Sequence, residues 1–303
     1  MDACKETREI LSQISPELAQ AAAIRQLARE EADCEPYDVW YLEAHGRRYI
    51  LKKAKEYEAE VYHCFLEGRD LPVPRLLGSA VCHGSEFILL EFVGDHNLQR
   101  ATCRDLRQAL DALIALQDAY WENTQAAHCA YDFSKSLSGR ENRGKYLGGD
   151  PRLEKAYQIF LEAYRRLPRT LCHDDLLPFN VQLSDHRAYL IDWEYGGVLP
   201  YPTSLARLLA HGEDDPNALF FLSDPDREFA IDYYFDHLVQ KHGISYGAYR
   251  DHLDLFFLYE YCEWVYIGHR YDTADSGNYR KYLPRAISQA EKILAKKRGL
   301  LST

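Results

Sequence analysis

The sequence predicts an α+β fold with two lobes, a small β-rich lobe that contains an antiparallel sheet and a larger lobe that is mainly helical. Strand-like runs rich in β-branched and aromatic residues are concentrated in the first third of the chain. Gly94 and Asp95 interrupt this pattern, and after them apolar residues recur mainly at helical spacing. We therefore expect two domains, residues 1–93 and residues 94–303.

The first lobe is expected to begin with a helix and a hairpin. Residues 15–31 start with a serine and a proline and continue with alanine and leucine, which is typical of a capped helix. Residues 39–44 and 47–53 are two β-rich runs separated by His45 and Gly46. This arrangement predicts a hairpin with a tight turn.

A second helix and a second hairpin complete this lobe. In residues 55–67 apolar side chains recur at helical spacing, and Glu58 faces the same side of the helix as these side chains, whereas Glu60 points elsewhere. Residues 76–81 and 86–92 have the composition of two further strands.

The second lobe is expected to be mainly helical. Helical spacing covers residues 102–121 and 151–167, and long helices rich in aromatic residues follow from Pro225 onward. Residues 136–150 are rich in glycine and serine, and they predict a loop long enough to be mobile.

Composition and charge limit the possible partners. The chain has 36 lysines and arginines against 47 aspartates and glutamates, a net charge of −11. This charge repels phosphate backbones and anionic membranes, so neither a nucleic acid nor a membrane is an expected partner. No run approaches the roughly eighteen apolar residues of a membrane helix, and the polar N-terminal segment does not resemble a signal peptide. We therefore expect a cytoplasmic protein, and its oligomeric state is not predicted.

The eight cysteines are expected to be reduced thiols, because they include no C-x-x-C pair and the chain is too long to depend on a disulfide framework. Cys172 and His173 could begin a metal site, but no second pair stands at ligand spacing. The cysteines therefore do not predict a structural zinc site.

A polar segment in the second lobe carries the candidate chemistry. The segment LCHDDLLPFN leads into a predicted hairpin of residues 181–183 and 188–192. Asp175, Asn180 and Asp192 can therefore converge at one mouth, although such residues in loops also commonly cap turns. An amide oxygen and a carboxylate suit a magnesium ion bound to triphosphate, and a third carboxylate can orient and deprotonate an attacking hydroxyl.

The spacing H-x-D-x-x-x-x-N, followed twelve residues later by D-W-E, resembles the catalytic loop and metal-binding motif of the protein-kinase-like fold. Its tryptophan is similar to the motif of the aminoglycoside phosphotransferase and choline kinase family. Carried over by position, the resemblance implies that His173 braces the loop, that Asp175 is the catalytic aspartate, and that Asn180 and Asp192 hold magnesium. The family motif more usually has glycine at position 174 and histidine at position 177, and this chain departs from it at both.

The resemblance extends into the first lobe. Lys52 resembles the strand lysine that binds the nucleotide phosphates, and Glu58 resembles the helix glutamate that pairs with it. Lys53 and Glu60 would then be solvated charges on the opposite faces. Taken alone, Lys52 and Glu58 could equally form a surface salt bridge worth only about 0 to 1 kcal/mol, so the order of the motifs along the chain supports the functional interpretation.

The connection between the lobes resembles the hinge that binds adenine through backbone groups, with Glu91 and Val93 as the candidate residues. The alternative is a simple linker between lobes. The phosphate-covering loop of the fold would fall at residues 33–38, which contain no glycine. Because backbone amides cradle phosphate less readily without glycine, either the loop binds nucleotide differently or the affinity is modest.

Candidate acceptor residues lie late in the chain. Glu260 and Trp264 share one stripe of a predicted aromatic helix, with Glu263 beside it, and choline kinases are similar in having an aromatic helix that meets the quaternary ammonium. Carboxylates among aromatic rings suit a cationic alcohol, but such stripes are more often core packing. Asp214 belongs to an acidic cluster that is either part of the acceptor site or a solvated loop. Relatives usually have an aspartate where this chain has Ser204.

The resemblance implies an ATP-dependent phosphotransferase that uses ATP and Mg²⁺. It would move the γ-phosphate to a hydroxyl of a small, amine-bearing molecule that is choline-like, ethanolamine-like or aminoglycoside-like. Two alternatives stay open. One is a sugar or amino-acid kinase, and the other is a non-catalytic, kinase-like binding protein in which the glycine-poor loop no longer supports productive ATP binding.

Overall fold

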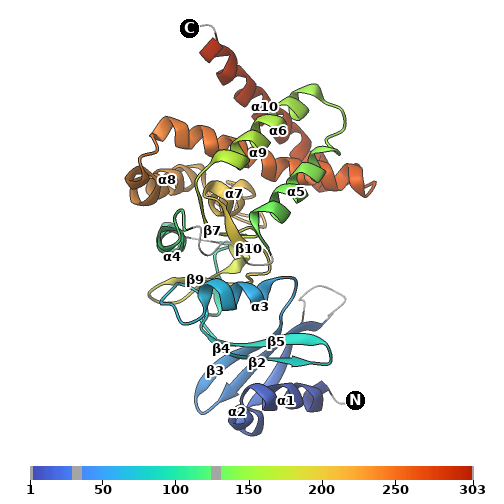
Figure 1. Cartoon of the computed structure of the whole chain (residues 1–303), viewed down its shortest axis with the longest axis vertical. Helices are drawn as coiled ribbons and strands as arrows, with labels where there is room; N and C mark the ends of the chain where they lie inside the picture. Colours follow the sequence, from blue (N-terminus) through green and yellow to red (C-terminus); the bar gives the residue numbers. More distant parts are fainter. Residues whose placement is uncertain (1–2, 29–35, 101, 124–130, 302–303) are drawn as a thin grey trace.

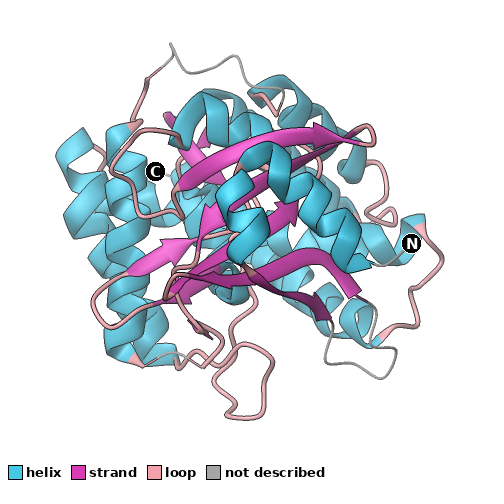
Figure 2. Ribbon diagram, turned by 90° about the horizontal axis from the view of Figure 1, so that it is seen from below, coloured by secondary structure: helices cyan, strands magenta, loops and turns pink. Residues whose placement is uncertain are grey.

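The computed structural model describes residues 3–28, 36–100, 102–123 and 131–301. It confirms the predicted α+β fold (Figure 1): a five-stranded antiparallel sheet lies toward the N-terminal end, and the remainder of the chain is largely helical. Seen from the side of the first lobe, the strands of this sheet cross in front of the helices of the second lobe (Figure 2). Where one domain ends and the next begins stays a prediction.

The sheet of the first lobe contains both predicted hairpins. Its strands follow the order β1-β2-β3-β5-β4, and every neighbouring pair is antiparallel. His45 and Gly46 form the first turn with φ values of 52° and 68°, a conformation that two-residue hairpin turns require. The strands are β1 (Ala23–Ala28), β2 (Pro36–Ala44), β3 (Arg47–Lys53), β4 (Leu76–Cys82) and β5 (Ser85–Glu91).

The helix predicted for residues 15–31 is wrong beyond its first turns. Helix α2 (Pro16–Ala21) has the expected cap, because the Ser15 side chain accepts a hydrogen bond from Leu18 N. The chain then becomes extended, and β1 pairs with β2. Alanine and leucine favour helix only weakly, and pairing along a sheet edge overrides that preference here. Before it lies α1 (Ala3–Ile14), which buries Ile10 and Leu11 and was not predicted.

The helix predicted for residues 55–67 is shorter than expected and has two parts. Helix α3 (Glu58–Val61) continues into one π-helical turn, η1 (Tyr62–Leu66). Glu58 is only 1% exposed, so it does face the core as predicted. π-Helical turns are frequent at functional sites, and this one directly follows the short helix that begins with the buried glutamate.

The second lobe contains the predicted helices and several short strands. Three of these strands, β6, β7 and β10, were not predicted. The helices are α4 (Cys103–Ala119), α5 (Phe133–Gly144), α6 (Pro151–Arg166), α7 (Pro202–Ala210), α8 (Asp224–Tyr234), α9 (Tyr246–Arg270) and α10 (Gly277–Leu301), with short η3 (Pro178–Asn180), η4 (Phe235–Val239) and η5 (Gln240–His242). The strands are β6 (His96–Asn97), β7 (Arg169–His173), β8 (Val181–Leu183), β9 (Ala188–Leu190) and β10 (Gly196–Pro200).

The mobile loop predicted for residues 136–150 is wrong, because most of that segment belongs to α5. The side chain of Asp132 caps the helix by accepting a hydrogen bond from Lys135 N. Ser136 and Arg140 are fully buried, and their tertiary contacts outweigh the low helix propensity of glycine and serine.

The polar segment lies between β7 and β8, where two small sheets fix its ends. β7 pairs with β10, which places His173 opposite Gly196. β8 and β9 form the predicted hairpin, and β6 pairs with its outer side. This framework holds the loop after His173 next to the segment that contains Asp192.

Five cysteines whose side chains the structure describes are free thiols, namely Cys64, Cys82, Cys103, Cys172 and Cys262. The other three lie outside the described side chains. Among the described helices, none is long and apolar enough to span a membrane.

Candidate active site

A cavity of about 550 Å³ lies between the sheet of the first lobe and the segment that follows the polar loop. Its walls come from β1 to β3, from the connection between the lobes and from residues 179–194. The structure therefore brings six predicted residues to one cavity: Lys52, Glu58, Glu91, Val93, Asn180 and Asp192. The predicted glycine-poor loop falls largely outside the described residues, although Tyr37 from its end lines the cavity.

The lysine of β3 lies at the centre of an acidic cluster. Lys52 Nζ lies 2.9 Å from Glu58 Oε2 and 3.0 Å from Glu58 Oε1, and it also donates to Asp192 Oδ1. Glu194 Oε1 is farther away, at 3.9 Å. Burial lowers the pKa of Lys52, but Glu58 and Asp192 outweigh burial and raise the pKa above its usual value. The lysine therefore remains cationic and ties the first lobe to Asp192.

Glu58 is the partner in this pair whose pKa burial raises. Burial raises its pKa to about 7, and the attraction of Lys52 opposes that rise. A glutamate this deeply buried is tolerated because its charge is paired.

His173 braces the polar loop through its ring. Its Nε2 lies 2.7 Å from the carbonyl oxygen of Ile191, and its Nδ1 accepts a hydrogen bond from Asp175 N at 3.3 Å. The hydroxyl of Ser204 accepts a hydrogen bond from His173 N at 2.9 Å. His173 therefore acts as a positioning residue, and Ser204 holds the loop where relatives usually have an aspartate.

Asn180 and Asp192 offer the oxygen ligands that a divalent cation needs. Asn180 Nδ2 donates to the backbone carbonyl of Asp175 at 2.8 Å, which leaves the amide oxygen as its free ligand atom. Carboxylate oxygens of Glu58, Asp192 and Glu194 lie within 4.8 Å of one another. Hard oxygen donors of this kind fit Mg²⁺. Sequence reasoning missed Glu194, although it is the last residue of the D-W-E motif.

Asp175 pairs with an arginine that sequence reasoning missed. Arg207 of α7 donates to Asp175 Oδ1 from Nε at 3.0 Å and from Nη2 at 2.7 Å. Its Nη1 donates to Glu260 Oε2 at 2.9 Å and to Glu263 Oε2 at 3.1 Å. Arg207 thus bridges the candidate catalytic carboxylate of Asp175 and both predicted glutamates. No motif marks Arg207, because its partners on α9 are distant in the sequence.

Asp175, Arg207, Glu260 and Glu263 are called the Arg207 cluster below. Its opposite charges lie close together, and they shift the pKa values of its buried members. Burial raises the pKa of Glu260, but Arg207 outweighs it and the pKa lies below its usual value. Burial likewise lowers the pKa of Arg207, and Glu260 and Glu263 outweigh it. The ion pair of Arg207 and Glu260 is therefore charged at neutral pH.

Trp264 and Asp214 are not part of the Arg207 cluster. The Trp264 ring stacks on Tyr282 with centroids 5.8 Å apart and an interplanar angle of 14°. The hydroxyl of Tyr282 lies 2.8 Å from His211 Nδ1, and His211 Nε2 lies 3.3 Å from Glu260. Asp214 is exposed and accepts a hydrogen bond from Asp224 N at the start of α8.

The aspartate at position 174, where the family motif usually has glycine, has a side chain that is only 10% exposed and that pairs with Arg140. Its carboxylate accepts hydrogen bonds from Arg140 Nη2 at 2.5 Å and from the Tyr131 hydroxyl. The rings of Tyr164 and Tyr259 lie 4.6 Å and 4.4 Å from the Arg140 guanidinium. Burial raises the pKa of Asp174, but Arg140 outweighs it and the pKa is lowered.

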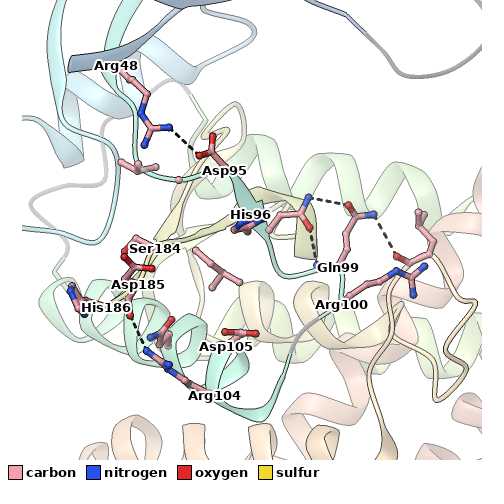
Figure 3. Close-up of a pocket in the computed structure, with 16 residues that line it drawn as sticks. Arg48, Asp95, His96, Gln99, Arg100, Arg104, Asp105, Ser184, Asp185 and His186 are labelled. Carbon is pink, nitrogen blue, oxygen red and sulfur yellow. Dashed lines mark hydrogen bonds and ion pairs between the residues drawn. The ribbon is translucent and has the colours of Figure 1, made fainter. Parts of the chain in front are cut away.

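A second cavity of about 1200 Å³ adjoins the first one at Val93, Gly94 and Asp95 (Figure 3). Its arginines are already engaged by the protein. Arg48 pairs with Asp95 at 3.0 Å, and Arg104 donates to the carbonyl oxygen of Asp185 at 2.9 Å. The first contact holds the connection between the lobes against β3, and the second holds α4 against the turn after β8.

Comparison with known proteins identifies the family to which this chain belongs. The profile of the phosphotransferase enzyme family (APH) matches residues 31–233. Protein LicA of Haemophilus influenzae is 27% identical over 120 residues, which are 39% of this chain and 45% of LicA. A second LicA from the same species is 26% identical over 121 residues, or 35% of its length. The chain thus spans less than half the length of these curated relatives.

Solved structures with the same fold cover nearly the whole chain. A thermostable mutant of aminoglycoside phosphotransferase APH(4)-Ia, in a ternary complex with AMP-PNP and hygromycin B, has a TM-score of 0.59 at 14% identity and covers 94% of this chain and 98% of its own. Choline kinase from Cryptosporidium parvum has a TM-score of 0.57 at 13% identity and covers 99% and 95%. These comparisons confirm the predicted family, the kinase-like fold and the enzyme class, a phosphotransferase.

Proposed function

The chain belongs to the phosphotransferase enzyme family, and we propose that it transfers the γ-phosphate of ATP to a hydroxyl of a small molecule in the presence of Mg²⁺. One observation carries this proposal. Lys52 joins Glu58 and Asp192 in a cavity that Asn180 also lines, while Asp175 stands one backbone hydrogen bond away from Asn180. Phosphoryl transfer depends on such positioning of charges more than on covalent chemistry.

The nucleotide would occupy the cavity of about 550 Å³. In that position the backbone of Val93 faces the base, and Lys52 contacts the phosphates. Asn180, Asp192 and Glu194 would hold Mg²⁺, which neutralises the phosphate charge during transfer. Solved relatives with bound AMP-PNP, ADP and GDP support a nucleotide in this fold.

Asp175 would act on the acceptor. Both hydrogen bonds from Arg207 go to Oδ1, so Oδ2 is left to accept the proton of the acceptor hydroxyl. In the reaction, the acceptor O–H bond and the bond between the γ-phosphorus and its bridging oxygen break, and a new O–P bond forms. ADP leaves with the electron pair of the broken P–O bond, and the proton passes to Asp175 and then to solvent.

The predicted amine-bearing acceptor would place its cation against Glu260, Glu263 and Trp264. One solved relative binds hygromycin B and another is a choline kinase, which supports a small-molecule acceptor. Glu260 and Glu263 already form ion pairs with Arg207, however, so the charge of the acceptor needs an argument of its own.

ADP formation measured with a panel of small alcohols tests the proposal. We expect Mg²⁺-dependent ADP formation that requires an acceptor, together with a product whose mass is increased by one phosphoryl group. A protein that binds ATP with Mg²⁺ but phosphorylates no acceptor would support the non-catalytic alternative. Absence of Mg²⁺-dependent nucleotide binding would overturn the assignment of the cavity.

A further inference from the structure

Arg207 occupies the position that a cationic acceptor would need. Three carboxylates, those of Asp175, Glu260 and Glu263, converge on its guanidinium group. Glu263 is paired a second time, because its Oε1 accepts a hydrogen bond from Arg143 at 3.3 Å. Two guanidinium groups thus pair with three carboxylates, which leaves one net negative charge in the cluster.

This pairing weakens the attraction that an ammonium group would feel at Glu260 and Glu263. Glu260 is 2% exposed, so its carboxylate is not accessible to a ligand. Both oxygens of Glu263 are engaged by arginines. An ammonium group placed beside these carboxylates would also lie next to Arg207 and would be repelled by it. The two glutamates therefore hold Arg207 and leave no pair of free carboxylates for a cation.

The cluster still offers two polar groups to an acceptor. Asp175 Oδ2 accepts no hydrogen bond from the residues that the structure describes, and the side chain is 37% exposed. Arg207 Nη2 has two N–H groups, and one of them goes to Asp175 Oδ1. Within the described part of the chain the second N–H has no partner, and the Arg207 side chain is 17% exposed. A hydrogen-bond acceptor and a donor thus stand side by side.

We propose that Arg207 selects an uncharged vicinal diol, such as a sugar or another polyol, as the phosphate acceptor. This inference rests on the proposed function. The reacting hydroxyl donates to Asp175 Oδ2, and the oxygen of the neighbouring hydroxyl accepts from Arg207 Nη2. Because a hydroxyl can both donate and accept, two adjacent hydroxyls match this pair of groups, whereas an ammonium group can only donate.

The test compares two classes of acceptor in wild type and variants. Initial rates of ADP formation are measured with uncharged diols (glucose, ribose, inositol, glycerol) and with cationic alcohols (choline, ethanolamine, an amino sugar). In wild type we expect kcat/KM for the best uncharged diol to exceed that for the best cationic alcohol by about tenfold or more. In Arg207→Gln this ratio should fall by about tenfold, mainly through the acceptor KM, with the KM for ATP within about twofold.

Two further variants control for folding. Arg165→Gln removes an arginine from an exposed pair with Glu141 and should leave the ratio unchanged. Arg207→Lys keeps the charge but loses the forked donor, so discrimination against cations should persist while the KM for diols rises. If Arg207→Gln and Arg207→Lys are both unfolded, the wild-type panel alone decides.

The failures are distinguishable. A wild-type preference for cationic alcohols, or an unchanged ratio in folded Arg207→Gln, overturns the inference and leaves the phosphotransferase proposal intact. If the protein binds ATP with Mg²⁺ but phosphorylates neither class, the proposed function fails and this inference fails with it.

Discussion

His173 Nε2 lies 2.7 Å from the carbonyl oxygen of Ile191, the residue that precedes Asp192. Because Nε2 must donate to that carbonyl and Nδ1 accepts from Asp175 N, the ring is held as a neutral imidazole. The ring therefore links the backbone of the candidate metal ligand to the backbone of the candidate catalytic residue. Burial lowers the pKa of His173 below its usual value of 6.5, which is consistent with the neutral form.

The first prediction follows from this pKa. In the unfolded chain the histidine binds a proton at its ordinary pKa, whereas the folded protein resists that proton. The stabilisation due to the neutral ring is thus complete above pH 6.5 and is lost as the pH falls from there through the lowered pKa of the folded state. We expect His173→Asn to cost about 2 kcal/mol near pH 8 and clearly less near pH 5, measured by urea unfolding.

A matched control for this experiment is His186→Asn, since His186 is exposed on the turn after β8. Its unfolding free energy should differ little from wild type at either pH. A cost of His173→Asn that is the same at both pH values would contradict the assignment of a neutral, buried imidazole.

The second prediction concerns Asp175. Asp175→Asn should lower kcat by about 10²- to 10⁴-fold, because the amide cannot accept the hydroxyl proton. The affinity for ATP with Mg²⁺ should stay within about twofold of wild type, since Asp175 does not line the nucleotide cavity. Steady-state kinetics and nucleotide titration measure the two quantities. Asp185→Asn, on an exposed turn, is the control, and near-native turnover in Asp175→Asn would remove the catalytic role.

The third prediction concerns Asp192. Asp192→Ala removes an oxygen ligand from the candidate metal site and a partner from Lys52, so the Mg²⁺-dependent part of nucleotide affinity should be lost. Titration of ATP with and without Mg²⁺ measures that part directly. Glu194→Gln should have a smaller effect, because Glu194 lies 3.9 Å from Lys52 at the edge of the cluster. Equal affinity of wild type and Asp192→Ala in Mg²⁺ would contradict the site.

Residues fixed by local chemistry were predictable from the sequence. The structure brings four such residues to one cavity, namely Lys52, Glu58, Asn180 and Asp192. Each was recognised from its spacing along the sequence or from the order of the motifs. The turn at His45 was predictable for the same reason, because a hairpin turn depends on its own residues.

Features that depend on distant pairing were not predictable. Arg207 acquires its role from Glu260, and no pattern within α7 marks it. Strand β1 has a sequence with helical preference and becomes a strand because β2 pairs with it. The glycine- and serine-rich composition of α5 disfavours a helix. The segment is nevertheless helical, and Arg140 within it pairs with Asp174, which is distant in the sequence.

The fourth prediction concerns that buried pair. Arg140→Met leaves the carboxylate of Asp174 buried beside an apolar side chain, and breaking such a pair costs about 3 to 5 kcal/mol. Adding Asp174→Gly removes the orphaned charge and supplies the residue that the family motif usually has. The double variant Arg140→Met/Asp174→Gly should therefore recover at least about half of the lost unfolding free energy.

Urea unfolding of the two single variants and the double variant measures the coupling. Arg143→Met is the control for removing a neighbouring arginine, because Arg143 forms its ion pair with Glu263 and not with Asp174. Strictly additive costs in the double variant would show that Arg140 and Asp174 do not act as a pair.

The last prediction separates packing from acceptor binding at Trp264. The ring stacks on Tyr282 and is partly buried, so Trp264→Ala should destabilise the second lobe, by less than the roughly 3 to 5 kcal/mol of a fully buried tryptophan. Trp264→Phe should be milder, because a ring still covers Tyr282. If Arg207 excludes a cation from this region, the KM values for ATP and for the acceptor should change little or change together. Melting temperature and both KM values are measured on the same preparations. A raised acceptor KM in Trp264→Ala with a normal melting temperature would instead place this face of α9 in the acceptor site, where an aromatic ring attracts a cation.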